Sequence, residues 1–577
     1  MDGYYSKTEP RFCCCTAEKF SFFFELIAPR FSGEFRNCGA IHRICSLLRK
    51  MGVTHFVEEE LEKTGEIQEE IEDVSRRCDA PLRSASFERF SFFYAPNDVP
   101  KDRLDLKQRE DKLFLGYMVI ARLELPDGAV RSYILEAVIA PPGKCSEKPS
   151  PDSNGRPKRS PVLNYVLNYY LHAHKVFPSV IGTRSENYPF EVDGAFFCQQ
   201  NNLTHVCAHA CLRMALNTTW HTVGIKISNR QINETLGIDH TAGRTVEGGL
   251  RVEQIELVLK NFGLFPYAQD FLTHAEVDYA EYLYPFVESG NPVILSFHPT
   301  YDSGHVVTII GHTMNSDRWD CEAHLAYDPG SRPFELFHAS STWVDHFLIN
   351  DDNFGMYTAL PVGYLRNPIR PRYDPTRRAR WVVSVFPSAS AVLPYVAELY
   401  AVEKSVVSLR KLEGGKDSAG RPLLETIPRN RWLSRLIAQS KEPTKRLVAR
   451  TVLTEKGEYV AFLRRISDLK DSEGSQLRPE DISDVESLLP VKFWVTEMTL
   501  PDLYTANKHK LGDMIHNETT STPSTDPPGI LYNTPEYVWG WLPCVEIPKV
   551  DDLRSWPLRG HVPLLRSSHV LRGAEEW

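Results

Sequence analysis

Two kinds of hydrophobic pattern alternate along the 577-residue chain, and together they predict an α+β fold. Between residues 38 and 51, apolar side chains recur every three or four positions, which is typical of a helix with one buried face. Residues 115–125 and 130–139 are instead rich in β-branched and aromatic residues. Because Pro126-Asp127-Gly128 lies between these two runs, they are predicted to form a hairpin.

Stretches rich in proline and small polar residues interrupt these patterns and mark candidate domain boundaries. Residues 141–161 and 517–529 have almost nothing to bury, and in residues 366–380 three prolines interrupt six arginines. We expect exposed loops at all three. The expected division is an N-terminal α+β domain over residues 1–160, a central domain over residues 161–365, and a C-terminal mixed α/β domain over residues 366–577.

Composition and charge narrow the class of protein. The formal charge of −9 argues against a nucleic-acid-binding protein, and the absence of any run of 18 apolar residues argues against a membrane partner. Twelve irregularly spaced cysteines suit reduced thiols, so we expect a cytoplasmic protein. Residues 58–73 hold nine acidic residues and are interpreted as a solvated helical face.

The most informative segment is a helical pattern that begins at a cysteine. Small or apolar residues follow at positions 0, 3, 4, 7 and 8 of this pattern, namely Cys207, Ala210, Cys211, Met214 and Ala215. Asn201, Asn202 and Thr204 precede it as candidate N-caps. In the first turn of a helix, the dipole and the free backbone N–H groups favour a thiolate, which is the nucleophilic form. A free cysteine can also be simply a small buried side chain, so Cys207 alone decides nothing.

A histidine and an aspartate follow at distances that suit a catalytic set. His305 comes directly after a glycine and begins a strand-like run, where its side chain is able to face a cleft. Asp328 ends another such run, because Pro329 cannot donate to a sheet ladder. If the two runs are adjacent antiparallel strands, the carboxylate orients the imidazole. Together with Cys207 they form a nucleophile, a base and an orienting group.

On the basis of these residues, the segment 190–360 resembles the papain-like cysteine peptidases, especially the bacteriocin-processing (double-glycine leader) peptidases. The matching pieces are Gln200, the helix from Cys207, Gly304-His305-Val306-Val307, and Tyr327-Asp328-Pro329. The resemblance implies a papain-like cysteine peptidase domain in the middle of the chain, flanked by N- and C-terminal mixed α/β domains. It implies that Gln200 donates to the oxyanion, beside the Cys207 N–H.

The resemblance also implies a hydrolase that cleaves a peptide or amide bond through an acyl-enzyme. Its substrate would be a protein or a peptide, and neither a metal nor an organic cofactor is expected. The flanking domains are available for a protein partner.

Two departures from the family pattern keep alternatives open. Val206-Cys207-Ala208 stands where Asp-Cys-Gly is expected, and the spacing from Gln200 to Cys207 is one residue too long, which makes Gln199 an alternative donor. Transglutaminases and arylamine acetyltransferases use the same Cys–His–Asp order with an amine as acceptor. A papain-like fold can also be an inactive binding module. A requirement for added amine would indicate the first alternative, and failure of Cys207 to react with an electrophile would indicate the second.

Other cysteines and histidines are interpreted as structural. Cys38 lies 267 residues before His305, which is improbable for a compact papain-like core, so we place it on a structural helix. Cys211 is expected to pack in the core. His312 lies seven residues beyond His305, too far along a strand to share its proton, and is interpreted as structural or exposed.

Overall fold

The fold is taken from a computed structural model of the 577-residue chain. The main ranges that the structure describes are 4–14, 35–53, 55–94, 114–141, 168–219, 226–239, 249–271, 278–300, 303–315, 337–365, 379–387, 447–467 and 479–499. Shorter described pieces are 393–394, 397–398, 401, 419–421, 501, 504, 510, 512–517, 531–533, 537–540, 554–557 and 565. The described residues form three sheets with helices packed on them, which is an α+β fold.

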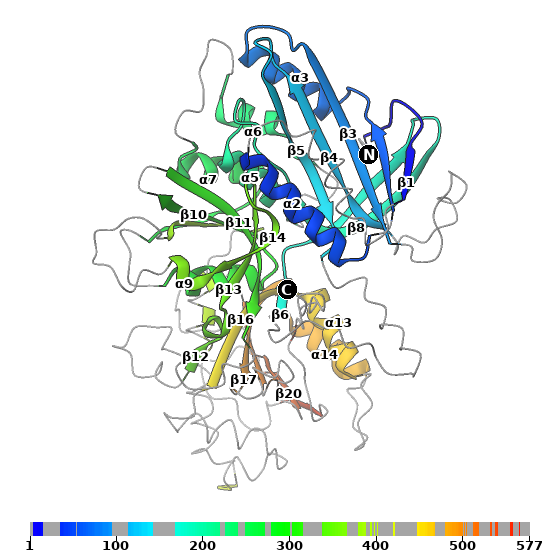
Figure 1. Ribbon diagram of the computed structural model, residues 1–577. Coiled ribbons are helices and arrows are strands. Elements are labelled where there is room, and N and C mark those ends of the chain that lie inside the picture. The colour runs from blue at the N-terminus through cyan, green and yellow to red at the C-terminus, as the bar shows by residue number, and fades with distance from the viewer. Residues whose placement is uncertain are drawn as a thin grey trace, which may run out of the picture.

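The first sheet is antiparallel and has the strand order β1-β2-β3-β4-β5-β8-β7. Its strands are β1 (Arg11–Cys14), β2 (His55–Glu60), β3 (Ser84–Phe93), β4 (Phe114–Glu124), β5 (Val130–Ile139), β7 (Lys175–Gly182) and β8 (Asn187–Phe197). Two helices belong to the same part of the chain, α2 (Phe35–Lys50) and α3 (Glu66–Arg77). Figure 1 shows α2 beside β14, and Arg43 of α2 donates to the Met356 carbonyl at 3.2 Å.

The predicted hairpin is confirmed, because β4 and β5 pair antiparallel around the turn at residues 126–128. Gly128 has a φ of 88°, a conformation that the turn requires and that side chains with a Cβ rarely adopt. The expected helix at residues 38–51 is confirmed as α2. The solvated helical face over residues 58–73 is wrong. The first acids of that run belong to β2, and Glu59 is buried against Arg89, whose Nη2 lies 2.7 Å from its carboxylate.

The second sheet follows the path β14-β13-β11-β10-β15-β9. Its strands are β9 (Tyr267–Asp270), β10 (Val293–Thr300), β11 (Ser303–Met314), β13 (His346–Asp351), β14 (Gly355–Pro361) and β15 (Ala379–Ser384), with β6 (Asn168–Leu171) paired to the last residues of β11. The helices of this part are α5 (Cys207–Thr218), α6 (Asn229–Leu236), α7 (Val252–Asn261), α8 (Tyr279–Glu288) and α9 (Val362–Leu365). Helix α5 packs against β11, which brings the first residues of both elements together.

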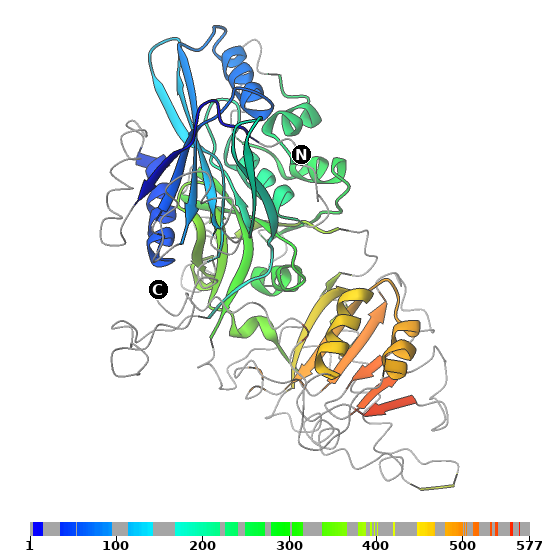
Figure 2. The same ribbon diagram turned by 90° about the vertical axis from the view of Figure 1, so that its right-hand side faces the viewer.

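The third sheet has the order β12-β16-β17-β18-β19-β20-β21. Its strands are β12 (Phe337–Ala339), β16 (Leu447–Glu455), β17 (Lys492–Thr499), β18 (Gly512–Asn517), β19 (Leu531–Asn533), β20 (Tyr537–Gly540) and β21 (Arg554–Pro557). The short 3₁₀ helix η7 (Ser340–Trp343) follows β12 directly. Helices α13 (Lys456–Ser467) and α14 (Pro479–Leu488) cover one face of this sheet, in yellow and orange in Figure 2.

Each sheet crosses a boundary expected from the sequence. Strands β7 and β8 lie after residue 160 but complete the first sheet, and β15 lies after residue 365 but belongs to the second. Strand β12 comes from the central segment and pairs parallel with β16. The reason is that strands which pair in a sheet can lie far apart in the sequence. The composition of the loops does not reveal which strands pair.

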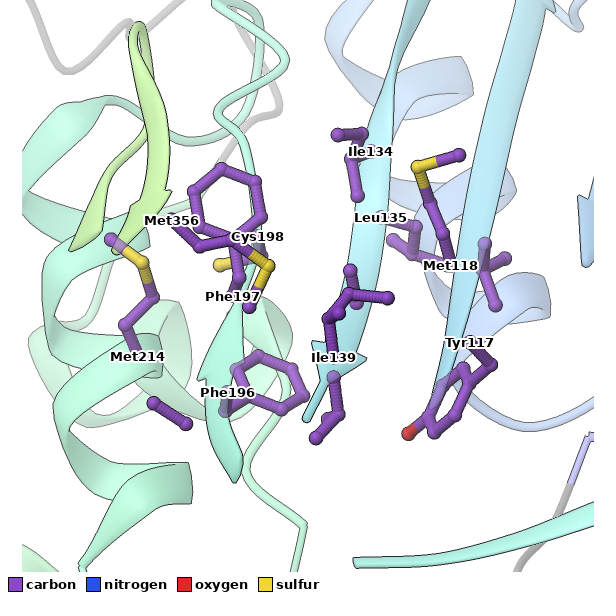
Figure 3. Packing of buried hydrophobic residues seen from close by; sticks show 14 of the residues in the cluster. Tyr117, Met118, Ile134, Leu135, Ile139, Phe196, Phe197, Cys198, Met214 and Met356 are labelled. Atoms are coloured by element: carbon purple, nitrogen blue, oxygen red, sulfur yellow. The ribbon is translucent and has the colours of Figure 1, made fainter. Parts of the chain in front are cut away.

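The largest core joins the first sheet to helix α5. In Figure 3, Phe196 and Cys198 of the β8 segment lie between Met214 of α5 and Ile139 of β5. All four side chains are buried. The first sheet and α5 therefore share one hydrophobic core, so the N-terminal part of the chain helps to hold α5 in position.

The three stretches expected to be exposed loops fall almost wholly outside the described residues. Among the helices in the described ranges, none is both long enough and apolar enough to cross a membrane.

Candidate active site

The cysteine at the start of α5 is the natural centre of the site. Helix α5 begins at Cys207, as the pattern predicts, and its N-cap residue is Val206 rather than Asn201, Asn202 or Thr204. As the first helical residue, Cys207 has a backbone N–H with no acceptor inside the helix. The Cys207 side chain is half-buried, unlike the fully buried Cys211 one turn later.

The loop before α5 is shaped by Asn201. Its Oδ1 accepts the backbone N–H groups of Leu203, Thr204 and His205 at 2.8, 2.9 and 3.3 Å. Its Nδ2 donates to the carboxylate of Glu70 at 2.7 Å. The Asn201 side chain therefore closes a tight turn just ahead of the helix instead of capping it.

Glu70 reaches this loop from α3, in the N-terminal part of the chain. Its Oε1 also accepts a hydrogen bond from the Tyr133 hydroxyl and lies 3.2 Å from Nε2 of His205. Burial would raise the pKa of Glu70, but the interactions with His205, Tyr133 and Asn201 outweigh it and lower the pKa to about 2. An ionised, buried carboxylate thus holds the loop that precedes Cys207.

His305 lies at the start of β11, opposite the end of β13. Its Nε2 lies 3.0 Å from Oδ2 of Asp351, the last residue of β13. The antiparallel register that pairs Thr308 with Asn350 places these two side chains at the same end of the sheet. The Cys207 side chain is another of the groups that raise the pKa of His305, so the thiol lies near the imidazole.

The electrostatics of this group favour an imidazolium. Burial alone would lower the pKa of His305, but the hydrogen bonds to Asp351 and Cys207 and the charges of Asp351 and Asp352 raise it to about 11. Burial and the neighbouring Asp351 carboxylate raise the pKa of Asp352 to about 7. Neither carboxylate oxygen of Asp352 has a hydrogen-bond partner among the described residues.

The donor atoms of His305, Asp351 and Asp352 all lie within 4.8 Å of one another, a spacing at which a metal ion can be bound. Cys207 also acts on the same imidazole, which favours interpreting the group as a catalytic set. A thiol, an imidazole and a carboxylate in series form a path for a proton, and we treat the group in that way.

The orienting acid expected from the sequence, Asp328, lies outside the described residues. In the part of the chain that the structure describes, Asp351 is the residue that accepts from His305. Sequence reasoning missed Asp351 and Asp352. The signal was the apolar run Phe347-Leu348-Ile349 followed by Asn350 and two acids, which is also a buried strand that ends in a carboxylate.

The two glutamines before Cys207 have different surroundings. Gln199 is buried, its Oε1 accepts the Ile134 backbone N–H at 2.9 Å, and its Nε2 donates to the Asp352 carbonyl at 2.9 Å. Gln200 is half-buried, and its side chain makes no hydrogen bond to another residue in the described ranges. Only Gln200 therefore has an amide that is not already engaged by the backbone.

Helix α5 is also fixed to the N-terminal part by a buried arginine. Arg213 donates to the Leu135 carbonyl at 2.8 Å and pairs with Glu66 and Glu136. Its guanidinium also lies over the Phe196 ring, 5.2 Å from the centroid. A buried charge of this kind is stable only in one arrangement of its partners, so it fixes how α5 is rotated against the first sheet.

The remaining candidate residues are structural in the described chain. Cys211 is buried, its Sγ contacts the Val306 carbonyl at 3.0 Å, and burial raises the pKa of its thiol well above the usual value. His209 is buried against Asn233, 2.9 Å away, and His205 belongs to the Glu70 group. Cys38 lies in α2. His312 is buried rather than exposed and belongs to a separate cluster.

The sequence model of the Peptidase_C39 like family matches residues 193–335. This segment contains Gln200, Cys207, His305 and Asp328, and it ends before Asp351. No curated protein matches the chain.

Proposed function

We propose that this chain is a cysteine peptidase that hydrolyses a peptide or amide bond through an acyl-enzyme on Cys207. The observation that carries the proposal is the group formed by Cys207, His305 and Asp351, in which Asp351 is hydrogen-bonded to the imidazole and Cys207 contributes to its raised pKa. The match of the surrounding segment to the Peptidase_C39 like family supports the same reaction class. The papain-like arrangement, a helix that begins at the nucleophile beside a sheet that carries the base, supports it further.

In the proposed mechanism, the imidazolium of His305 keeps the Cys207 sulfur in its nucleophilic form. The sulfur attacks the carbonyl carbon of the substrate, and the carbonyl π electrons move to the oxygen. The Cys207 N–H and the Gln200 side-chain amide stabilise this oxyanion. As the tetrahedral intermediate collapses, His305 gives its proton to the leaving nitrogen, and a thioester remains on Cys207.

The second half of the reaction uses the same groups in reverse. His305, now neutral, takes a proton from a water molecule that attacks the thioester carbon. The carbon–sulfur bond breaks, a carboxylic acid leaves, and the thiolate–imidazolium pair is restored. Asp351 keeps the imidazole oriented throughout by accepting its Nε2–H. The proposed substrate is a protein or peptide, because the reaction needs an amide bond whose nitrogen can leave with the proton from His305.

The test is a mass-spectrometric search for the acyl-enzyme and its products. Purified chain is incubated with a denatured protein mixture, and new peptide termini are compared between the native enzyme and Cys207→Ala. Cys211→Ala is the matched control, since that thiol lies one turn away but is buried. New termini that depend on Cys207 alone are expected. Termini that appear only with added amine would indicate an acyltransferase, and a Cys207 inert to iodoacetamide in folded protein would indicate a binding module.

A further inference from the structure

A second cluster of chemically capable side chains lies at the other end of β11. Nε2 of His172 and Nε2 of His312 are 3.0 Å apart, and Nε2 of His312 is 3.0 Å from Oε1 of Glu288. Oε2 of Glu288 lies 3.6 Å from Nε2 of His172. All three side chains are at least nine-tenths buried, and their donor atoms lie within 4.8 Å of one another.

The hydrogen bonds around His312 fix which ring nitrogen faces the cluster. Its Nδ1 lies 2.9 Å from the Thr313 carbonyl, an acceptor, so this nitrogen carries a proton and donates it. In the neutral ring, Nε2 then presents a lone pair to a second imidazole nitrogen and to a carboxylate oxygen. Three atoms with lone pairs meet at one point, and a cation between them would satisfy all three.

Glu288 is held in place by groups outside this trio. Its Oε2 accepts from Arg450 of β16 at 2.7 Å, and its Oε1 accepts the Tyr284 hydroxyl. Arg450 is therefore a buried cationic partner for the Glu288 carboxylate. Outer hydrogen bonds that orient a histidine and a carboxylate in this manner are typical of metal sites.

We propose that His172, His312 and Glu288 bind a divalent transition-metal ion, with zinc as the natural occupant of this donor set. Nitrogen and oxygen ligands of tetrahedral zinc, at bond lengths of about 2.0–2.1 Å, stand roughly 3.3 Å apart, which is close to the separations found here. One water molecule completes the four-coordinate shell. Two imidazoles and one carboxylate in a buried pocket suit zinc better than calcium or magnesium, which prefer oxygen ligands alone.

The ion would connect segments that are distant in the sequence. His172 directly follows β6, His312 lies on β11, and Glu288 ends α8 beside the third sheet. Gly311 allows β6 to come close, because a Cβ at this position would lie 2.0 Å from the Tyr170 carbonyl oxygen. The site lies seven residues, roughly 20 Å, along β11 from His305, so it acts on the fold and not on the reacting bond.

The experiment measures zinc binding by the full chain in a Cys207→Ala background, so that zinc on the catalytic thiol does not contribute. Protein freed of metal by chelator is titrated with Zn²⁺ by calorimetry, and Co²⁺ is added separately to read its ligand-field absorption. One high-affinity ion per chain is expected, together with a higher midpoint of thermal unfolding when zinc is present. His172→Ala and His312→Ala are each expected to weaken binding by more than about 100-fold, which exceeds the 10- to 100-fold of an outer-shell change.

His338→Ala is the matched control, since His338 is another buried histidine beside β16 and should leave zinc affinity unchanged. The proposal is overturned if the Cys207→Ala chain takes up no zinc and its unfolding midpoint is the same with and without chelator. The histidines then share a proton with Glu288 instead. It is also overturned if the His172 and His312 variants bind zinc as tightly as their parent. If those variants do not fold, the titration is repeated with His305→Ala added to the Cys207→Ala chain, which disables the other group in the described ranges that can bind a metal ion. Retained zinc binding then supports the proposal, and lost binding overturns it.

Discussion

Asp351, the last residue of β13, accepts the Nε2–H of His305, and Oδ2 of Asp351 lies 3.0 Å from this nitrogen. The consequence is that the acid which orients the base lies 23 residues beyond Asp328, the acid that the family pattern indicates. The two residues are separable by substitution, because each can be changed to asparagine without loss of volume.

We predict that Asp351→Asn lowers kcat/KM for a peptide substrate by about 10²–10⁴-fold, because the amide favours the wrong tautomer of His305. Asp328→Asn is the matched comparison and should retain most of the activity. The measurement is initial rate on a peptide found to be cleaved by the native enzyme. If Asp328→Asn is the inactive variant and Asp351→Asn the active one, Asp351 has no orienting role.

A second prediction concerns the pH dependence of stability. His305 has a folded-state pKa of about 11 against an ordinary value of 6.5, so its charged form stabilises the fold fully below pH 6.5. This contribution decreases as the pH rises from 6.5 toward 11. The unfolding midpoint of the native chain should therefore exceed that of His305→Gln most at pH 6, and the difference should shrink by pH 10. A difference that grows with pH would contradict the charged imidazole.

The proposed pairing of Cys207 with His305 predicts how the Cys207 thiol reacts. Alkylation of Cys207 by iodoacetamide should be fast at pH 6 in the native chain and slow in His305→Ala, because the imidazolium that favours the thiolate has been removed. The rate is followed by mass spectrometry of the Cys207 peptide. Cys211 serves as an internal reference, since its buried thiol should stay unmodified in both proteins. Equal alkylation rates in the two proteins would show that His305 does not activate the Cys207 thiol.

Substitutions of Gln199 and Gln200 should have different effects, one on stability and the other on turnover. Gln200→Ala should spare alkylation of Cys207 but lower amide turnover by about 10²–10³-fold, as loss of an oxyanion donor does. Gln199→Ala should lower stability instead, by about 1–3 kcal/mol, because the Ile134 N–H and the Asp352 carbonyl lose a buried partner. Urea unfolding and turnover are measured on both variants. Normal turnover in Gln200→Ala would remove this side chain from the mechanism.

Glu70 is predicted to be a positioning residue that acts through Asn201. Glu70→Gln should lower kcat by about 10-fold with little change in KM, because a displacement of the loop weakens stabilisation of the oxyanion more than binding of the substrate. Glu72→Gln, on the exposed side of the same helix, is the control. Restoration of kcat in Glu70→Asp would support a role for the charge. A loss of stability in Glu70→Gln with kcat unchanged would indicate a purely structural role.

The sequence predicts the parts of the site that depend on local pattern. Helix α5 starts at Cys207 because small and apolar residues recur there at helical spacing, and the His305 strand follows from a continuous β-rich run. Asp351 was not found by the same reasoning, because its position depends on the register between β11 and β13. That register is decided by pairs of residues 35 to 42 positions apart, which no local window contains.

The acidic run at residues 58–73 shows a second limit of prediction from the sequence, which concerns the burial of charged side chains. A high density of acids usually marks a solvated surface, yet Glu59 and Glu70 are buried here. Each is balanced by a partner from elsewhere in the chain, Arg89 for Glu59 and the Asn201 loop for Glu70. Burial of a charge is determined by its partner, and the partner becomes evident only once the strands are paired.

The anchoring of α5 by Arg213 has a consequence for how the protein is made. On the ribosome, Glu66 and Glu136 emerge before Arg213, so the first sheet can form before α5 is available to pack against it. Asp351 emerges 144 residues after Cys207. A nascent chain therefore carries the proposed nucleophile long before the proposed base can be oriented, and the proposed peptidase activity is delayed until most of the polypeptide has been synthesised.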